Sequence, residues 1–298
     1  MIKRSVATEA EYRSHHGLNF SKLAAFYHDG NYSPDHALMT IEHKSYFEYG
    51  KMFETLLQDT VKGTREFFDR FFISSTQGSL PDKLIQWIDS KEDLESKYNK
   101  NKDGSLSKTF FTMHQFLDEC KDNPGKIPVT VETKERLNNH VLRMCDMPYF
   151  GEKCGDLLAR AEWQVPIIWT DERDGLKKKA LLDCIVDNGA VYIYFDVKTS
   201  ADESRFFRML TKKYWIQDIH YTEGINAVIG PALQATFLVA FKDDPFICQP
   251  VMIDYGNIDQ RIVAINEYYR LCEAYAEWDK RPRGWLPLGQ KKFYLPQN

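Results

Sequence analysis

The sequence predicts a mixed α/β domain in which helices flank a sheet and the amino-terminal part is helical. Apolar residues follow a helical period over 19–59 and 132–160, and short apolar runs separated by turn residues begin at position 161. The chain has 298 residues, of which 43% are hydrophobic and 14% are aromatic. Such a chain can bury a core of its own and is not a disordered polymer. We expect a single domain over 1–298.

The amino-terminal half is expected to be mainly helical. The predicted helices span 19–29, 45–59, 132–146 and 149–160. Leu23, Phe26 and Tyr27 share one face of the first helix, and Gly30 would end it. Glu54 lies at the edge of the apolar stripe of the second helix, where it is either a site residue or a solvated helix residue.

The stretch over 61–130 has a different texture. It is rich in charged residues and poor in apolar ones, as in the segment SKEDLESKYNKNKDGSLSK. We interpret it as a helical insertion with exposed loops, which has no separate core of its own.

The second half predicts the sheet. The expected strands span 161–170, 179–187, 190–199, 232–241 and 250–255. Pro166 indicates an edge position or a bulge in the first of them. The Asn188-Gly189 pair is typical of a tight hairpin, so the second and third strands should be antiparallel neighbours. Helices are expected over 203–224 and 257–279.

One charged triplet stands out against this background. The chain holds six triplets of the form Asp/Glu-x-Lys, and only Asp196-Val197-Lys198 lies in a strongly hydrophobic strand. Side chains alternate along a strand, so Asp196 and Lys198 project from the same face. Burying such charges is costly unless they are paired or bound to a metal ion.

Asp183 precedes the hairpin and should lie near Asp196, one step from direct opposition across the two strands. Two close carboxylates repel each other unless a cation joins them, and oxygen ligands favour Mg²⁺ or Mn²⁺ over zinc. Lys198 could then orient a water molecule or stabilise a phosphate. The alternative is a buried Asp196–Lys198 ion pair with an incidental Asp183.

Gln217 and Tyr221 are one helical turn apart on the helix that follows the triplet strand. Gln217 could orient a ligand or a water molecule, and Tyr221 could contact DNA or pack in the core. The alternative is a surface Gln and a core Tyr.

The order Asp183, Asp196-Val197-Lys198-Thr199 and Gln217-x-x-x-Tyr221 resembles the PD-(D/E)xK nuclease superfamily. Within it, the chain is most similar to phage-type recombination exonucleases of the exodeoxyribonuclease VIII (RecE) and lambda exonuclease kind. The segments LNFSKLAAF and YFEYGKMFETLLQD resemble the first helices of that family. The resemblance spans 18–59 and 160–240. Leu182 replaces the proline of the superfamily's name.

The resemblance implies a restriction-endonuclease-like fold and a Mg²⁺-dependent exodeoxyribonuclease. The enzyme would be a hydrolase that digests linear double-stranded DNA from 5′ to 3′ for homologous recombination. The implied metal ligands are Asp183, Asp196, the Val197 carbonyl, Glu54 and Glu162. Lys198 would assist the water nucleophile, and Gln217 and Tyr221 would position water or DNA.

The implied partners are double-stranded DNA ends and a single-strand annealing recombinase, and the enzyme itself would be a ring-like homo-oligomer. Sequence-independent phosphate contacts are expected from Thr199, Arg205, Arg208, Lys212 and Lys213, although each cation could instead belong to a solvated face. The basic tail over 280–298 would line a DNA channel or pack on a neighbouring subunit. The net charge of −4 argues against a generic cationic coat protein, but not against a local basic groove.

Two further expectations concern location and cofactors. We find no transmembrane run and no secretory signal, so a cytoplasmic protein of a bacterium or a phage-infected cell is expected. The six cysteines form no CxxC pair, so we expect reduced thiols and no iron–sulfur cluster. Two rival functions stay open: an endonuclease of the same superfamily, and a non-catalytic DNA-binding protein on the same fold.

Overall fold

The computed structural model describes residues 8–27, 45–76, 101, 103, 105, 107–242 and 247–280. Its centre is a mixed sheet of five strands in the order β5-β6-β7-β8-β9, which confirms the predicted mixed α/β class. The strands are β5 (Glu162–Thr170), β6 (Lys177–Asp187), β7 (Tyr192–Ser200), β8 (Thr236–Phe241) and β9 (Cys248–Val251). β7 and β8 are parallel, and the other neighbouring pairs are antiparallel. Because β5 is an edge strand, Pro166 interrupts no inner ladder.

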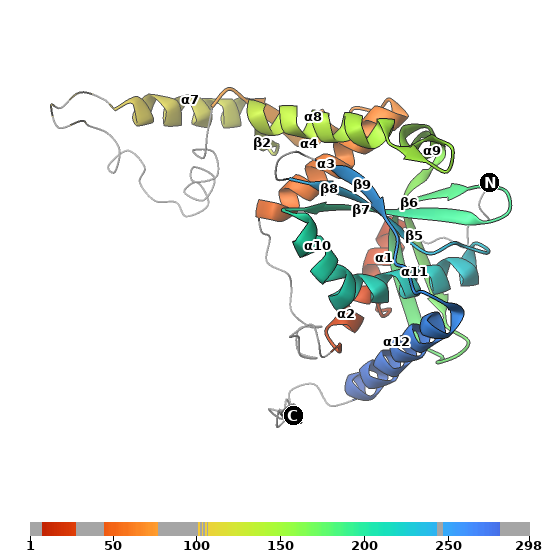
Figure 1. The fold of residues 1–298 in the computed structure, drawn as a ribbon. Helices are drawn as coiled ribbons and strands as arrows, with labels where there is room; N and C mark the ends of the chain where they lie inside the picture. Colours follow the sequence, from red (N-terminus) through yellow and green to blue (C-terminus); the bar gives the residue numbers. More distant parts are fainter. Residues whose placement is uncertain are drawn as a thin grey trace, which may run out of the picture.

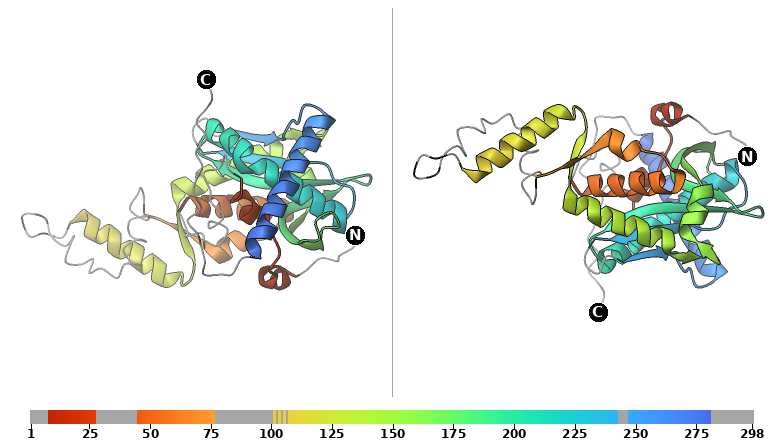
Figure 2. Two further views of the ribbon diagram at one scale, coloured as in Figure 1. Left: turned by 90° about the horizontal axis from the view of Figure 1, so that it is seen from below. Right: turned by 90° about the horizontal axis from the view of Figure 1, so that it is seen from above.

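Helices cover both faces of this sheet (Figure 1, Figure 2). One face carries α3 (Ser45–Lys62), α8 (Val131–Asp146) and α9 (Cys154–Arg160). The other face carries α2 (Phe20–Ala24), α10 (Glu203–Met209), the π-helix η3 (Leu210–Tyr214), α11 (Trp215–Val228) and α12 (Ile258–Asp279). The other helices within the described residues are α1 (Glu9–Ser14), α4 (Glu66–Arg70) and α7 (Lys108–Asp122), and α7 extends away from the sheet in every view.

A buried histidine fixes α3 and α8 to the sheet. The Tyr49 hydroxyl on α3 donates to Nδ1 of His140 on α8, 2.9 Å away, and Nε2 of His140 donates to the carbonyl of Phe241 at 2.9 Å. Phe53 and Leu57 on the same face of α3 are fully buried. The helix that carries Glu54 is therefore held firmly against the sheet.

The sheet forks between β6 and β7. The two strands pair from Asp187 and Tyr192 as far as Cys184 and Phe195, and then they separate. Beyond the fork, the amino-terminal segment takes the place of β7: the Leu18 amide donates to the Lys177 carbonyl at 2.9 Å, and the Lys179 amide donates to the Leu18 carbonyl at 2.8 Å. β7 continues beside β8 instead.

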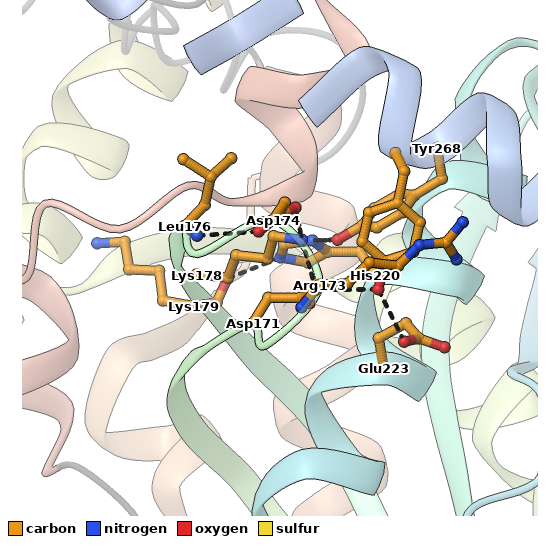
Figure 3. Close-up of polar contacts among 10 residues, drawn as sticks. Asp171, Arg173, Asp174, Leu176, Lys178, Lys179, His220, Glu223 and Tyr268 are labelled. Atoms are coloured by element: carbon orange, nitrogen blue, oxygen red, sulfur yellow. Dashed lines mark hydrogen bonds and ion pairs between the residues drawn. The ribbon is translucent and has the colours of Figure 1, made fainter. Parts of the chain in front are cut away.

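A second polar cluster ties the β5–β6 hairpin to the helices below the sheet (Figure 3). The Lys178 ammonium, which is 0% exposed, lies 2.6 Å from carboxylate oxygens of both Asp171 and Asp174. His220 of α11 accepts from the Tyr268 hydroxyl of α12 at 2.9 Å and donates to the Lys179 carbonyl at 3.1 Å. Because the buried charge and the imidazole both have partners, we interpret this cluster as structural.

Several predicted boundaries were wrong. α2 ends at Ala24, so the first helix is shorter than expected within the described residues. A small hairpin of β3 (Pro148–Tyr149) and β4 (Glu152–Lys153) replaces the start of the helix expected at 149, because Phe150 and Gly151 both adopt positive φ. The helix expected over 203–224 contains the π-helix and continues to Val228.

The stretch over 61–130 is not purely helical. It contains a parallel pair of short strands, β1 (Phe71–Ser74) and β2 (Ile127–Thr130), and both of its ends contribute to the core through Phe67, Phe71 and Val129. Most of the charged segment around 77–100, like the basic tail over 281–298, lies outside the described residues. Within the described part of the chain, no helix has the length and apolar character needed to span a membrane.

Candidate active site at the strand fork

Asp183 and Asp196 lie where the fork opens. In the register set by Cys184 and Phe195, they are the next two residues along the strands and occupy directly opposing positions. The predicted one-step offset was wrong because residues 188–191 form a loop of four residues, closed by the Asp187–Tyr192 pair, and not a two-residue turn. The Val197 amide donates to Oδ2 of Asp183 at 2.8 Å, so this carboxylate ends the β6–β7 ladder.

Asp196 is buried, with 2% exposure, and contacts two side chains. The Lys198 ammonium forms an ion pair with its Oδ2, and Nε2 of Gln217 donates to its Oδ1 at 2.5 Å. Beyond the ion pair, Oδ2 of Asp196 makes no hydrogen bond, and the buried Oε1 of Gln217 has no partner. Buried polar atoms without partners are rare in proteins and are typical of sites that bind something. Gln217, at 2% exposure, is therefore not the surface residue of the alternative interpretation.

Glu54 approaches this pair from α3. One turn earlier, Gly50 passes so close to β7 that an added Cβ would lie 3.5 Å from Oγ1 of Thr199. The half-buried Glu54 carboxylate accepts a hydrogen bond from Nε2 of Gln164 on β5. The helix thus brings a third carboxylate to the open end of the fork.

The charges of the site do not balance. Burial raises the pKa of Asp183 well above its usual range, and the neighbouring Asp196 and Glu54 raise it further. Burial also raises the pKa of Glu54, again with a contribution from Asp196. Burial alone would lower the pKa of Lys198, but the negative charges around it outweigh this effect and keep the pKa above its ordinary value. Lys198 therefore faces three carboxylates, with Lys213 acting on Asp196 and Arg70 on Glu54, and a bound cation would relieve the repulsion among the carboxylates.

A second lysine flanks the site. The centroid of the Tyr214 ring, at the end of the π-helix, lies 5.3 Å from Nζ of Lys198 and 5.4 Å from Nζ of Lys213. Burial lowers the pKa of Lys213 to about 8, with a further contribution from the Lys198 charge. Lys212 is half-buried, whereas Arg205 and Arg208 are exposed on α10.

Three other predicted site residues are buried or half-buried. Tyr221 is buried and packs edge-on against Phe20, with ring centroids 5.8 Å apart, as expected for a core tyrosine. Burial raises the pKa of Tyr221 well above its usual range and the nearby Asp196 and Asp183 raise it further, so Tyr221 adjoins the site and its contact with DNA stays a prediction. Glu162 is half-buried at the start of β5, opposite Ile185, and its role as a metal ligand stays a prediction. Thr199 is half-buried beside α3.

Two residues of the site were not predicted. Tyr214 gives no signal in the sequence, because a tyrosine next to two lysines is unremarkable on a helix. Gln164 does give one, because it is a polar residue in the otherwise apolar run EWQVPII. Its amide engages Glu54 although 110 residues separate the two in the chain.

The donor types fit a hard divalent cation such as Mg²⁺, since all are oxygens and carry excess negative charge. The buried Oε1 of Gln217, which has no hydrogen-bond partner, agrees with this. The carboxylates are not gathered into a preformed cage: among the described residues, no three His, Cys, Asp or Glu side chains are grouped so that they could hold a metal ion. In this structure Lys198 and Gln217 engage the oxygens of Asp196.

Comparison with known proteins adds little to this geometry. No protein-family model matches the chain, and no curated protein matches it. Among solved structures, a "Putative exonuclease" from Eubacterium rectale is 13% identical, with 80% of this chain and 88% of that chain covered and a TM-score of 0.29. The protein SSO0001 is 14% identical, with 80% and 90% covered and a TM-score of 0.29. Similarity at this level carries no argument, so the function is argued from the site.

Proposed function

We propose that the protein is a metal-dependent nuclease that hydrolyses phosphodiester bonds of DNA. The observation that carries the proposal is the opposed pair Asp183 and Asp196 at the strand fork, with Lys198 and Glu54 beside them. The contrast with the buried Lys178 supports it. Lys178 neutralises two carboxylates that have other partners, whereas Lys198 faces three carboxylates in a site with a buried oxygen that has no hydrogen-bond partner.

Asp183, Asp196, Glu54 and the Val197 carbonyl would hold Mg²⁺, or Mn²⁺ in its place, and Glu162 is a further candidate ligand. The bound ion would supply Lewis-acid stabilisation of the phosphate and a more acidic water molecule. Lys198, whose pKa the surrounding negative charges raise against the effect of burial, would act as a cation that orients the nucleophilic water and stabilises charge on the phosphate. Gln217 keeps Asp196 in place through its hydrogen bond.

The substrate is proposed to be DNA, held through its backbone. Lys213 lies beside the site, and Thr199, Lys212, Arg205 and Arg208 extend from the carboxyl end of β7 onto the helices that follow. Lysine and arginine side chains contact phosphates without reading bases. Binding should therefore be sequence-independent and weaken as salt increases.

The resemblance in sequence motifs refines the proposal. It favours an exonuclease that digests linear duplex DNA from 5′ to 3′ during homologous recombination, as a ring-like homo-oligomer working with a single-strand annealing recombinase. The cell would be a bacterium or a phage-infected bacterium, with the enzyme in its cytoplasm. These refinements depend on the resemblance, whereas the nuclease chemistry depends on the site.

The test compares end-labelled linear duplex with closed circular duplex in Mg²⁺, in Mn²⁺ and in chelator. The wild type should digest the linear DNA only when metal is present, and Asp196→Asn and Lys198→Ala should lose this activity. Lys121→Ala is the matched control, because it breaks an exposed lysine–aspartate pair on α7, far along the chain from the fork. Cutting of the circle would indicate an endonuclease. DNA binding without cleavage by the wild type would indicate a non-catalytic binding protein, and full activity in both site variants would refute the site.

A further inference from the structure

Gln164 has an unusual backbone. Phe150 and Gln164 are the non-glycine residues with positive φ among those the structure describes, at 49° and 50°. Phe150 lies in the tight β3–β4 turn, where such a conformation is common, but Gln164 lies inside the strand β5. A left-handed residue within a strand is a strained feature that the surrounding structure must enforce.

At Gln164 the side chains of β5 change the face of the sheet toward which they point. Trp163 packs with the cluster under α3, α8 and α9, whereas Val165, two residues on, packs with the cluster under α11. Regular alternation would put both on one face. The register between β5 and β6 is the same before and after this point, with Gln164 and Asp183 the opposing residues left out of the ladder. The strand pair therefore kinks at the position of Asp183 without an inserted residue.

The kink gives Gln164 its partner. From this position its amide, which is exposed to solvent, reaches across to Glu54 of α3 and donates to Oε1. An exposed glutamine could form hydrogen bonds with water from an unstrained backbone. The strained backbone of Gln164 is therefore best explained by the contact that its side chain makes with Glu54.

We infer that Gln164 is a positioning residue that holds Glu54 toward Asp183 and Asp196, and that the left-handed kink in β5 exists to aim its amide. The inference rests on the proposed function for the role of Glu54 as a metal ligand. It assigns a positioning role to an edge-strand residue that is not itself one of the proposed metal ligands.

The experiment is a double-mutant cycle with Gln164→Gly and Glu54→Ala, read out as Mn²⁺ affinity by calorimetry and as stability in urea. Glycine adopts the left-handed backbone conformation without strain and removes the whole side chain, including the amide that contacts Glu54. Gln164→Gly should weaken Mn²⁺ binding about tenfold, and this loss should vanish in the Glu54→Ala background. Phe150→Gly is the matched control, since it changes the other left-handed residue and should leave Mn²⁺ binding unchanged.

The inference is overturned if Gln164→Gly binds Mn²⁺ like the wild type, or if its loss is equally large without Glu54. A wild type that binds no Mn²⁺ and cuts no DNA refutes the proposed function instead. In that case the urea data decide the inference: coupling between the two substitutions supports it, and strict additivity overturns it.

Discussion

The backbone amide of Val197 donates a hydrogen bond to Oδ2 of Asp183, 2.8 Å away, at the point where β6 and β7 part. A side chain thus takes a hydrogen bond that a neighbouring strand would otherwise accept. The same contact fixes the Asp183 carboxylate opposite Asp196, although the two carboxylates repel each other. The two carboxylates thus lie together at the point where the β6–β7 ladder ends.

Asp183→Asn should stabilise the protein while abolishing metal-dependent cleavage. The side-chain oxygen of the new asparagine can still accept the hydrogen bond from the Val197 backbone amide, but the repulsion between residue 183 and the carboxylates of Asp196 and Glu54 disappears. Because the folded pKa of Asp183 is raised, the contribution of this residue to stability is largest below the ordinary pKa of an aspartate and is lost as pH rises toward the folded pKa. Urea unfolding should therefore show little difference at pH 3.5 and a gain of about 1 kcal/mol or more at pH 8. Equal stability of both proteins at pH 8 would contradict the charge argument.

Lys198→Met should cost both activity and stability. Lys198 is the cation paired with Asp196, and its side chain is 20% exposed, so its loss should destabilise the fold by about 3 kcal/mol or somewhat less. The double variant Lys198→Met/Asp196→Asn should recover most of this stability, because residue 196 no longer carries a buried charge without its cation, and it should stay inactive. Recovery of cleavage in the double variant would show that these residues serve only the fold.

Lys213 should confer a pH dependence on DNA binding. With a pKa of about 8, it is charged at pH 7 and largely neutral at pH 9. The affinity of the wild type for duplex DNA should therefore fall between these two pH values, while Lys213→Arg should stay constant. Lys213→Met should reduce the slope of log affinity against log salt by about 1. Fluorescence anisotropy without divalent metal measures all three, and an identical pH profile for wild type and Lys213→Arg would exclude the contact.

Gln217→Leu should destabilise the protein by about 1–3 kcal/mol, since Oδ1 of Asp196 would lose the donor that satisfies it. Gln217→Glu should destabilise it further at neutral pH, because a second carboxylate would face Asp196. The measurement is thermal or urea unfolding at pH 7, with metal absent. Wild-type stability in Gln217→Leu would mean that Asp196 finds another partner.

Lys178→Met should lower the stability of the protein without changing the activity of the folded molecules. Removing this ammonium leaves Asp171 and Asp174 buried without a cation, which should cost about 3–5 kcal/mol. The folded fraction should nevertheless cleave DNA at the wild-type rate per molecule, because the hydrogen bonds and ion pairs of Lys178 run to Asp171 and Asp174 and not to the proposed metal ligands. Activity is measured at low temperature and normalised to the folded fraction from circular dichroism. A large loss per folded molecule would place Lys178 in the functional site.

The sequence was sufficient to predict the strands and the central pair of carboxylates. Alternation and turn residues located β5, β6 and β7 within a few positions, and the unusual cost of a charge in an apolar strand singled out Asp196. The register error at Asp183 arose because the Asn188-Gly189 pair predicts a two-residue turn, whereas the chain closes a longer loop.

Other features depend on tertiary contacts that leave no local pattern. Tyr221 has the spacing of a site residue, yet its ring is taken up by packing against Phe20, which comes from the far amino-terminal segment. The contact between Gln164 and Glu54 joins an edge strand to a distant helix, and no periodicity reports it. The pairing of Leu18 with β6 beside the fork also joins segments that lie far apart in the chain.

The π-helix η3 has a consequence for how this chain tolerates changes in length. Its wider turns accommodate one residue more than a regular helix, between the exposed arginines of α10 and Gln217 of α11. Deleting a single residue such as Thr211 would convert the wider turn into a regular helical turn, because the i→i+5 spacing of the π-helix becomes the i→i+4 spacing of the α-helix. The helical residues before and after this point would keep nearly the same relative rotation, so Gln217 would still face Asp196. The number of residues between Lys198 and Gln217 can therefore fall by one within η3 without turning Gln217 away from the site.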